Sequence, residues 1–205
     1  MSKPGIPIVV SAASGTGKTS LCLKLLETLS KVERSVSYTT RKPRGEEIDG
    51  RDYHFVDDPT FDRMIAENAF IEHADVFGFR YGTGYAAIRR QLDEGVDVLL
   101  DIDVQGGLQI RDSLPESLLI FLLPPSMTEL RRRLINRATD APDVIERRLR
   151  EARNEIAQCR GYDYLVLNDD FDKAAADLRA IVIAARNTAH RNDELVDALV
   201  ADPTL

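Results

Sequence analysis

Two stretches of this chain concentrate the side chains that could do chemistry: residues 14–19, "SGTGKT", and residues 37–55. The first combines two glycines with Lys18 and the adjoining Thr19. Glycines let the backbone turn its N–H groups inward around an anion, the lysine can reach the outer phosphates, and the hydroxyl can ligate Mg²⁺. This spacing predicts a loop that binds the phosphates of a nucleoside triphosphate.

The surroundings of this loop favour phosphate binding over a simple turn. Ala12 stands where the usual G-x-x-x-x-G-K-[ST] pattern has its first glycine. However, Ile6–Val10 predicts a buried strand before the loop, and the leucine spacing over Ser20–Leu29 predicts a helix after it. A helix N-terminus also favours anions. We expect the triphosphate to contact the whole loop, namely Ala12, Ala13, Ser14, Gly15, Thr16, Gly17, Lys18, Thr19 and Ser20.

The second stretch, "SYTTRKPRGEEIDGRDYHF", gathers hydroxyls and cations. Arg41 and Arg44 are three residues apart, and Pro43 between them disfavours a regular helix. On a loop, two guanidinium groups can converge on one phosphate. Solvated surface arginines are the alternative, but the hydroxyls of Tyr53 and Tyr81 could add donors. The composition therefore favours a second phosphate pocket.

Carboxylates follow the apolar run within Val96–Gly106, "VDVLLDIDVQG", which predicts another buried strand. Asp101 and Asp103 could be solvated carboxylates at a strand end. Beside a phosphate loop, such a pair resembles the acidic strand that helps to hold a metal. We expect Thr19 to ligate Mg²⁺ directly and Asp101 to act through water.

Arginines are also concentrated between residues 131 and 153, which hold eight of them against four acids. Two solvated helices with pairs such as Glu146 and Arg150 would account for many of these arginines. Transfer of a phosphoryl group places negative charge between donor and acceptor, and arginines can stabilise that charge. Both interpretations remain open from the composition alone.

The bulk composition limits the classes of partner. The 205 residues carry a net charge of -7, and the pI is about 5.1. This balance argues against a broad nucleic-acid surface or a basic membrane face. The two cysteines form no disulfide framework, and no segment predicts a signal peptide or a membrane span. We expect a cytoplasmic protein that binds neither nucleic acid nor a membrane.

Taken together, these stretches resemble the bacterial-type guanylate kinases, a family of P-loop nucleoside monophosphate kinases. The resemblance runs nearly end to end, through "IVVSAASGTGKTSL", "SVSYTTRKPRGEEIDGRDYHFV", "FIEHADVFGFRYGT", "DVLLDIDVQG", "FLLPPS", "YLVLNDD" and "NDDFDKA". It implies transfer of the γ-phosphoryl group of ATP to GMP, and to dGMP, giving ADP and GDP with Mg²⁺. The process implied is purine nucleotide metabolism, including GMP recycling.

The resemblance also implies roles for individual residues. The GMP phosphate would contact Arg41, Arg44, Tyr53 and Tyr81, and the guanine would contact Ser37, Glu72, Thr83 and Asp103. Arg137 and Arg148 would close on the triphosphate, although Ala138 replaces the more usual glycine after Arg137. Asn168 would meet the adenine and ribose end of ATP. The catalytic set implied is Lys18, Arg41, Arg44, Arg137 and Arg148.

The chemistry of guanine agrees with this assignment. Guanine presents an O6 acceptor beside N1–H and N2–H₂ donors, so a hydroxyl of Ser37 or Thr83 can donate to it and Glu72 can accept from it. Adenine presents the reverse pattern, and the unpaired polar groups would cost on the order of 10⁴ in discrimination. Outside this context, Glu72 would be interpreted as a surface carboxylate.

The fold class expected is α/β, a three-layer P-loop kinase with a parallel-sheet core. The core would comprise residues 1–34, 94–127 and 159–205, with strands at Ser117–Pro125 and Asp163–Asp170. Residues 35–93, with one helix at Phe61–Asn68, would form an inserted GMP-binding lobe. Residues 128–158, helical on both sides of "RATDAPD", would form a lid. The segment 191–205 predicts an amphipathic helix that could pack on the core or on a second copy in a homo-oligomer.

Two rival functions remain. Guanylate-kinase-like modules in scaffold proteins bind phosphorylated peptides without turnover, but they typically have eroded phosphate loops, whereas this loop keeps Lys18 and Thr19. A related P-loop kinase could instead phosphorylate another acceptor, such as a ribose bisphosphate. The complete set of guanine contacts argues against that acceptor.

Overall fold

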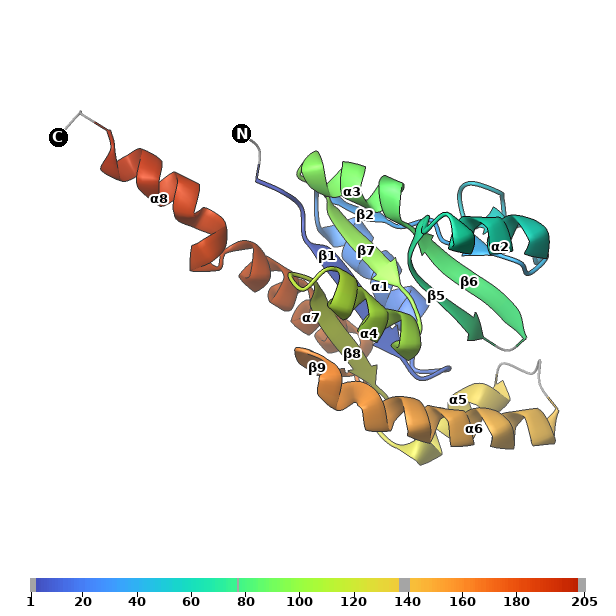
Figure 1. Cartoon of the computed structure of the whole chain (residues 1–205). Helices are drawn as coiled ribbons and strands as arrows, with labels where there is room; N and C mark the ends of the chain where they lie inside the picture. The colour runs from blue at the N-terminus through green and yellow to red at the C-terminus, as the bar shows by residue number, and fades with distance from the viewer. Residues whose placement is uncertain (1–2, 77, 137–140, 203–205) are drawn as a thin grey trace.

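A central sheet of five parallel strands organises the protein (Figure 1). The computed structural model describes residues 3–76, 78–136 and 141–202. In spatial order the strands are β2 (Val32–Arg34), β7 (Asp97–Asp101), β1 (Pro7–Ala12), β8 (Leu118–Leu123) and β9 (Tyr164–Leu167). Every residue of β1 is buried, as expected for a parallel strand covered on both faces. The predicted α/β fold with a parallel-sheet core is confirmed.

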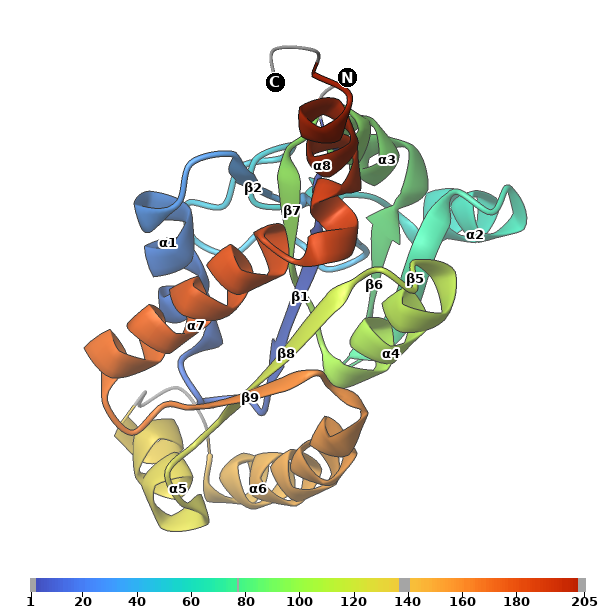
Figure 2. The ribbon, with the colours of Figure 1, turned by 90° about the vertical axis from the view of Figure 1, so that its left-hand side faces the viewer.

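Helices cover both faces of this sheet and make three layers (Figure 2). Helices α1 (Lys18–Thr28) and α7 (Phe171–Arg186) pack on one face, against Ile8 and Val10 of β1. Helices α3 (Tyr85–Asp93) and α4 (Val104–Ser113) pack on the other face, against Val9. Successive side chains of a strand point to opposite faces, so the apolar residues of β1 pack against the helices on both faces of the sheet.

A second, smaller sheet lies beside the first and has the order β4 (His54–Phe55), β3 (Tyr38–Thr39), β6 (Phe79–Gly84) and β5 (Phe70–Val76). Helix α2 (Asp58–Ala66) begins earlier than predicted because the Asp57 carboxylate accepts the Thr60 N–H at 2.9 Å and Pro59 suits the first turn. The described part of residues 35–93 contains two helices, α2 and α3, rather than the one predicted. The additional helix, α3, packs on the central sheet. The boundaries of the inserted lobe stay a prediction.

The arginine-rich segment forms α5 (Met127–Asn136) and α6 (Pro142–Ala157), followed by the short helix η1 (Gln158–Gly161). Leu130 and Leu134 of α5 and Ile145 and Leu149 of α6 form one buried apolar cluster that includes Ala13 of the glycine loop. Two helices are present as predicted, although α6 begins at Pro142, inside the segment 137–143 that was predicted to separate them. This apolar contact anchors α5 and α6 next to the loop.

The strand predicted within Val96–Gly106, which was expected to end in carboxylates, is β7, and it ends at the first of them, Asp101. Asp103 instead caps α4, since its carboxylate accepts the N–H of Gln105 at 2.7 Å and that of Gly106 at 3.2 Å. An aspartate at this position satisfies backbone donors that a helix start leaves unpaired. The apolar run alone did not distinguish a strand end from a helix cap.

The C-terminal segment extends away from the body of the protein (Figure 1). After η2 (Ala189–Asn192), helix α8 (Asp193–Val200) exposes four apolar side chains, those of Leu195, Val196, Leu199 and Val200. The segment is thus an amphipathic helix that does not cover the core. Among the described residues, no helix has the length and apolar character needed to cross a membrane.

A buried carboxylate connects the segment before β1 and the end of α7 to the central sheet. Asp97, at the start of β7, is only 5% exposed. Its Oδ1 accepts the Ile6 N–H at 2.8 Å, and its Oδ2 pairs with Arg186 Nε at 2.7 Å. Arg186 also donates to the carbonyl of Ser30 at 2.9 Å. The last residue of α7 therefore neutralises the buried carboxylate at the start of β7.

Candidate active site

The glycine loop connects β1 to α1 in a conformation that requires glycine. Gly15 and Gly17 have φ angles of 92° and 101°, in the left-handed region that other residues rarely adopt. A Cβ at Gly17 would also lie 2.7 Å from Asn168 Nδ2. Lys18 is the first residue of α1, directly after the loop, so the lysine and the N-terminus of the helix lie at the same anion-binding position.

Lys18 lies at the carboxyl end of the central sheet, with its Nζ 2.6 Å from Asp101 Oδ1 and 2.8 Å from the carbonyl oxygen of Ile102. Burial by itself lowers the pKa of Lys18, but the charge and hydrogen bond of Asp101 outweigh burial, so the net pKa is raised. The lysine is therefore a fixed cation. The predicted proximity of the loop and the acidic strand is seen directly.

Arg34, which the sequence analysis did not single out, is a second cation on Asp101. Its Nη2 lies 3.6 Å from Asp101 Oδ2, and the Asp101 side chain is only 8% exposed. Arg34 ends β2, which is the neighbour of β7 in the sheet. No local motif marks this arginine, because the contact depends on strand pairing.

On the outer side of the loop, Asn168 follows β9 and is 5% exposed. Its Nδ2 donates to the carbonyl of Thr16 at 2.6 Å. Arg133 of α5 donates to the same carbonyl at 3.3 Å and to that of Asn168 at 3.1 Å. These residues line a hollow of about 410 Å³ together with Gly15, Gly17, Ser20, Asp169 and Phe171. Arg133 was hidden among the neighbouring arginines of the sequence.

The second sheet contains a cluster around Arg41, whose side chain is 6% exposed. Arg41 Nε donates to the Tyr81 hydroxyl at 3.3 Å. Its guanidinium carbon lies 5.2 Å from the centre of the Tyr53 ring, within the range of a cation–π contact. The Tyr53 and Tyr81 rings are 6.0 Å apart. The structure thus brings Arg41, Tyr53 and Tyr81 together.

Glu72 and Thr83 face each other on paired strands β5 and β6. The Thr83 hydroxyl donates to Glu72 Oε1 at 2.5 Å, and both residues are buried. Burial raises the pKa of Glu72 to about 7, the Thr83 hydrogen bond opposes this shift, and the charge of Asp103 adds to it. Glu72, Thr83 and Asp103 therefore form one electrostatic group, and Glu72 is not the surface carboxylate of the alternative interpretation.

This raised pKa predicts a pH-dependent contribution to stability. Between the ordinary value of 4.5 and about 7, folded Glu72 holds a proton that the unfolded chain has lost, so its contribution to stability falls as the pH rises through this range. Glu72→Gln removes this titration. Urea unfolding should show the variant gaining stability relative to the unmodified protein at about pH 8 compared with about pH 5. The same difference at both pH values would contradict the shift.

A cleft of about 480 Å³ lies between the second sheet and α6. Asp75, Gly78 and Asp103 line one side of it, and Arg147, Glu151 and Glu155 of α6 line the other. Burial raises the pKa of Glu155, and the charges of Asp103 and Glu151 add to this shift. Arg148 lies on α6, half-buried, whereas Arg137 falls outside the described residues. The cleft separates two parts of the candidate site.

Other predicted residues lie at the edges of these clusters. Thr19 and Ser20 are exposed at the start of α1, and Ser37 is half-buried just before β3. Arg44 is exposed on the loop that follows β3. Among the described residues, no group of three histidine, cysteine or acidic side chains could hold a metal ion.

Comparison with known proteins assigns the chain to one group of sequences. Residues 5–185 match a family model described as guanylate kinase. The guanylate kinase of Alkalilimnicola ehrlichii is 49% identical over 97% of this chain and 98% of its own length. That of Psychrobacter arcticus is 49% identical over 93% of this chain and 91% of its own length.

The fold agrees with the same group. A crystal structure of the guanylate kinase from Anaplasma phagocytophilum superposes with a TM-score of 0.79. It shares 35% sequence identity with this chain, and the match covers 96% of both chains. The similarity therefore includes the central sheet, the second sheet and the arginine-rich helices.

Proposed function

The chain belongs to the guanylate kinase family and is an ATP:GMP phosphotransferase, and we propose that its site has a donor half at the glycine loop and an acceptor half in the second sheet. The observation that supports this division is that two separate groups of cations lie beside two separate sheets. Lys18, at the start of α1, pairs with Asp101 at the carboxyl end of the central sheet, and Arg41 lies just after β3 of the smaller sheet. Each half would hold one phosphorylated substrate.

In the donor half, the loop Ala12–Ser20 would wrap the ATP phosphates with its N–H groups. Lys18 would transfer its hydrogen bonds from Asp101 to phosphate oxygens, while Asp101 stays close to Arg34. The hollow beside Asn168 would take the adenine and ribose end of ATP. Arg133, which already bonds the loop, would support that end.

In the acceptor half, Arg41, Arg44, Tyr53 and Tyr81 would bind the phosphate of GMP. Arginine forks and phenolic hydroxyls together suit the several oxygens of a phosphate. Arg44 is exposed and Arg41 is buried, so the phosphate would lie between a mobile donor and a fixed one.

The guanine base would be read by Glu72, Ser37, Thr83 and Asp103. Ionised Glu72 can accept hydrogen bonds from guanine N1–H and N2–H₂. The Thr83 proton is already donated to Glu72, which leaves Ser37 as the hydroxyl for O6. Asp103 adds an acceptor next to the amino group, while it continues to cap α4. This donor and acceptor pattern excludes adenine.

Phosphoryl transfer needs no general base here, because the attacking GMP phosphate oxygen is already anionic near neutral pH. That oxygen forms a bond to the γ-phosphorus as the bond to the β-phosphate oxygen of ATP breaks, and ADP leaves with the electron pair. The task of the protein is to bring two polyanions together and balance their charge. Lys18, Arg41 and Arg44 would supply this charge, with Arg137 and Arg148 added by the lid.

Closure of the cleft between the second sheet and α6 would exclude water during transfer. The open cleft of about 480 Å³ leaves room for this movement. Arg148 is carried by α6, so closure would bring its charge toward the transferring group. Water exclusion both strengthens electrostatic contacts and prevents hydrolysis of ATP.

Mg²⁺ is the cofactor that this chemistry requires. The ion usually binds through phosphate oxygens, waters and one or two protein groups. The Thr19 hydroxyl is exposed beside the loop, and Asp101 would act through water, so the few protein donors fit this ion. When bound, Mg²⁺ would neutralise charge on the ATP phosphates.

None of the proposed acceptor contacts involves the ribose 2′-hydroxyl, so dGMP is also expected to be a substrate. The cytoplasm is the compartment that we propose, because Cys22 and Cys159 are both free thiols in the described structure.

The test measures ADP production from Mg-ATP with GMP, dGMP, AMP, UMP or a ribose bisphosphate as acceptor. We expect turnover with GMP and dGMP, and a kcat/KM for AMP that is lower by on the order of 10⁴. Comparable turnover with AMP or a ribose bisphosphate would overturn the guanine assignments. An unchanged rate after chelation of Mg²⁺ would overturn the proposed cofactor.

A further inference from the structure

The Glu47 carboxylate makes three hydrogen bonds to the segment that carries Arg41 and Arg44. Arg41 Nη1 donates to Glu47 Oε2 at 2.8 Å, and Arg41 Nη2 donates to Oε1 at 2.9 Å. The backbone N–H of Arg44 donates to Oε2 at 2.7 Å. One carboxylate thus holds the guanidinium of one arginine and the main chain of the other.

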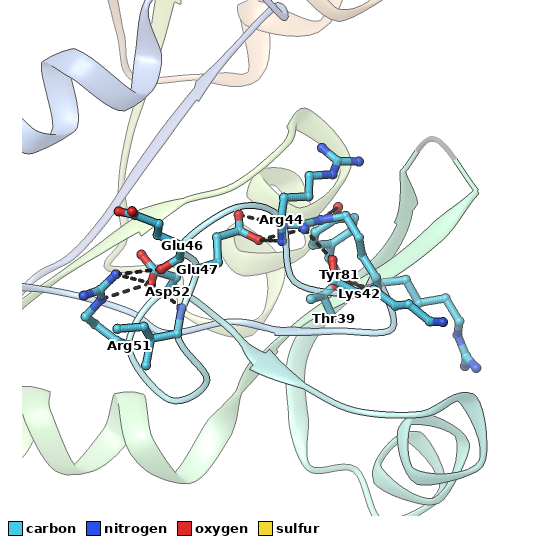
Figure 3. Close-up of polar contacts among 11 residues, drawn as sticks. Thr39, Lys42, Arg44, Glu46, Glu47, Arg51, Asp52 and Tyr81 are labelled. Carbon is cyan, nitrogen blue, oxygen red and sulfur yellow. Dashed lines mark hydrogen bonds and ion pairs between the residues drawn. The ribbon is translucent and has the colours of Figure 1, made fainter.

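The backbone of a tight turn keeps Glu47 in this position. The Glu47 N–H donates to the Arg44 carbonyl at 3.1 Å, and Gly45 within the turn has a φ of 54°. Because the carboxylate is bound back to the Arg44 N–H of its own turn, it cannot leave Arg41 without giving up that bond as well. Figure 3 shows Glu47 directed at this contact, while Glu46 points away from it.

Arg41 uses nearly all of its donors in this arrangement. Of its five N–H groups, one donates to Tyr81, one to the carbonyl of Lys42 at 2.8 Å and two to Glu47. A single Nη2 donor remains. A cation this buried needs a counter-ion, and Glu47 supplies it before any phosphate is bound. Arg41 is consequently held in one orientation.

Arg44 is arranged differently. Within the described residues, its guanidinium has no hydrogen-bond or ion-pair partner, and its side chain extends away from the Glu47 carboxylate (Figure 3). Only its backbone is fixed. The two arginines are therefore held differently. In Arg41 the guanidinium itself is fixed by hydrogen bonds, whereas in Arg44 only the backbone is fixed and the guanidinium is unpaired within the described residues.

We infer that Glu47 is a positioning residue for the acceptor phosphate, which sets the guanidinium of Arg41 and the base of the Arg44 side chain at a fixed separation. This inference rests on the proposed function, in which both arginines bind the GMP phosphate. In this role Glu47 would act through the two arginines and would contact neither nucleotide itself. Its negative charge would repel the phosphate, so its benefit lies in geometry: two cations held in place lose less freedom when the phosphate arrives.

The test compares binding of GMP with binding of guanosine, which lacks the phosphate, by calorimetric titration. Glu47→Gln should weaken GMP binding by about 10- to 100-fold and leave guanosine binding unchanged, since small misplacements of positioning groups have effects of this size. Glu46→Gln removes the same charge from the neighbouring exposed residue and should change neither affinity. If Glu47→Gln does not fold, Glu47→Asp, which keeps the charge on a shorter arm, should show the same phosphate-specific loss.

Two results would overturn this role. Unchanged or tighter GMP binding would mean that Glu47 is only a temporary counter-ion that the phosphate replaces. An equal loss for GMP and guanosine would mean that Glu47 only maintains the loop. Arg44→Gln separates this inference from the proposed function. If that variant weakens GMP alone and Glu47→Gln does not, the phosphate pocket stands and the role of Glu47 falls; if neither variant affects GMP alone, the pocket assignment itself fails.

Discussion

Lys18→Ala is expected to reduce the rate of phosphoryl transfer by at least on the order of 10³-fold, the scale found when a preorganised cation on a transferring phosphoryl group is removed. Lys18 is the cation that the glycine loop delivers to the end of the central sheet, 2.6 Å from Asp101. Without it, the loop N–H groups and Mg²⁺ alone would have to neutralise the ATP phosphates. The loss should appear in kcat and in ATP affinity, measured by coupled ADP production.

GMP binding provides the internal control for this variant, because no proposed GMP contact involves Lys18. Circular dichroism should show a folded chain, although Asp101, left with Arg34 as its cation, will lower the free energy of unfolding by roughly 1–3 kcal/mol. Lys24→Ala, on the exposed face of the same helix, should be near normal, since it loses only a surface pair with Glu27. Activity of Lys18→Ala within tenfold of the unmodified protein would remove the loop assignment.

Glu72→Gln is expected to weaken GMP binding by on the order of 10²-fold and to leave ATP binding nearly unchanged. A hydrogen bond to an ionised group contributes up to about 3 kcal/mol, and the amide both loses the charge and presents a donor toward guanine donors. Glu72 is 3% exposed, so water cannot replace the lost contact. The measurement is the ratio of the two dissociation constants in the variant and the unmodified protein.

Glu67→Gln provides a matched control, because Glu67 is an exposed carboxylate at the end of α2 in the same part of the chain. It should change neither dissociation constant. Equal weakening of GMP and ATP by Glu72→Gln would show that Glu72 supports the fold and does not read the base.

Much of the fold and the donor half of the site could be predicted from short-range patterns in the sequence. The loop containing Lys18 could be predicted because its glycines, lysine and hydroxyl are consecutive and lie between an apolar run and a helical repeat. The same locality explains why the helices around residues 137–143 were found. The end of the strand at a carboxylate was predicted, but the role of Asp103 as the cap of α4 was not, because an aspartate after an apolar run fits both a strand end and a helix cap.

Contacts between distant segments could not be predicted in this way. Arg34 reaches Asp101 only because β2 and β7 are neighbours in the sheet, and no spacing in the sequence records that order. The ion pair of Glu47 with Arg41 depends on the turn that starts at Arg44, so the charge of Glu47 had no visible partner in the sequence. Glu72 could be named from the family resemblance, but its burial against Thr83 required the structure.

The ion pair between Asp97 and Arg186 has a consequence for synthesis on the ribosome. The glycine loop, the second sheet and the arginine-rich helices are all complete before the end of α7 leaves the exit tunnel. Until Arg186 emerges, the Asp97 carboxylate at the start of β7 has the Ile6 N–H but lacks its cation, and a buried charge without a partner is strongly destabilising. Every residue proposed for chemistry precedes Arg186 in the sequence, so the chain contains the whole candidate site before the buried Asp97 can gain its cation.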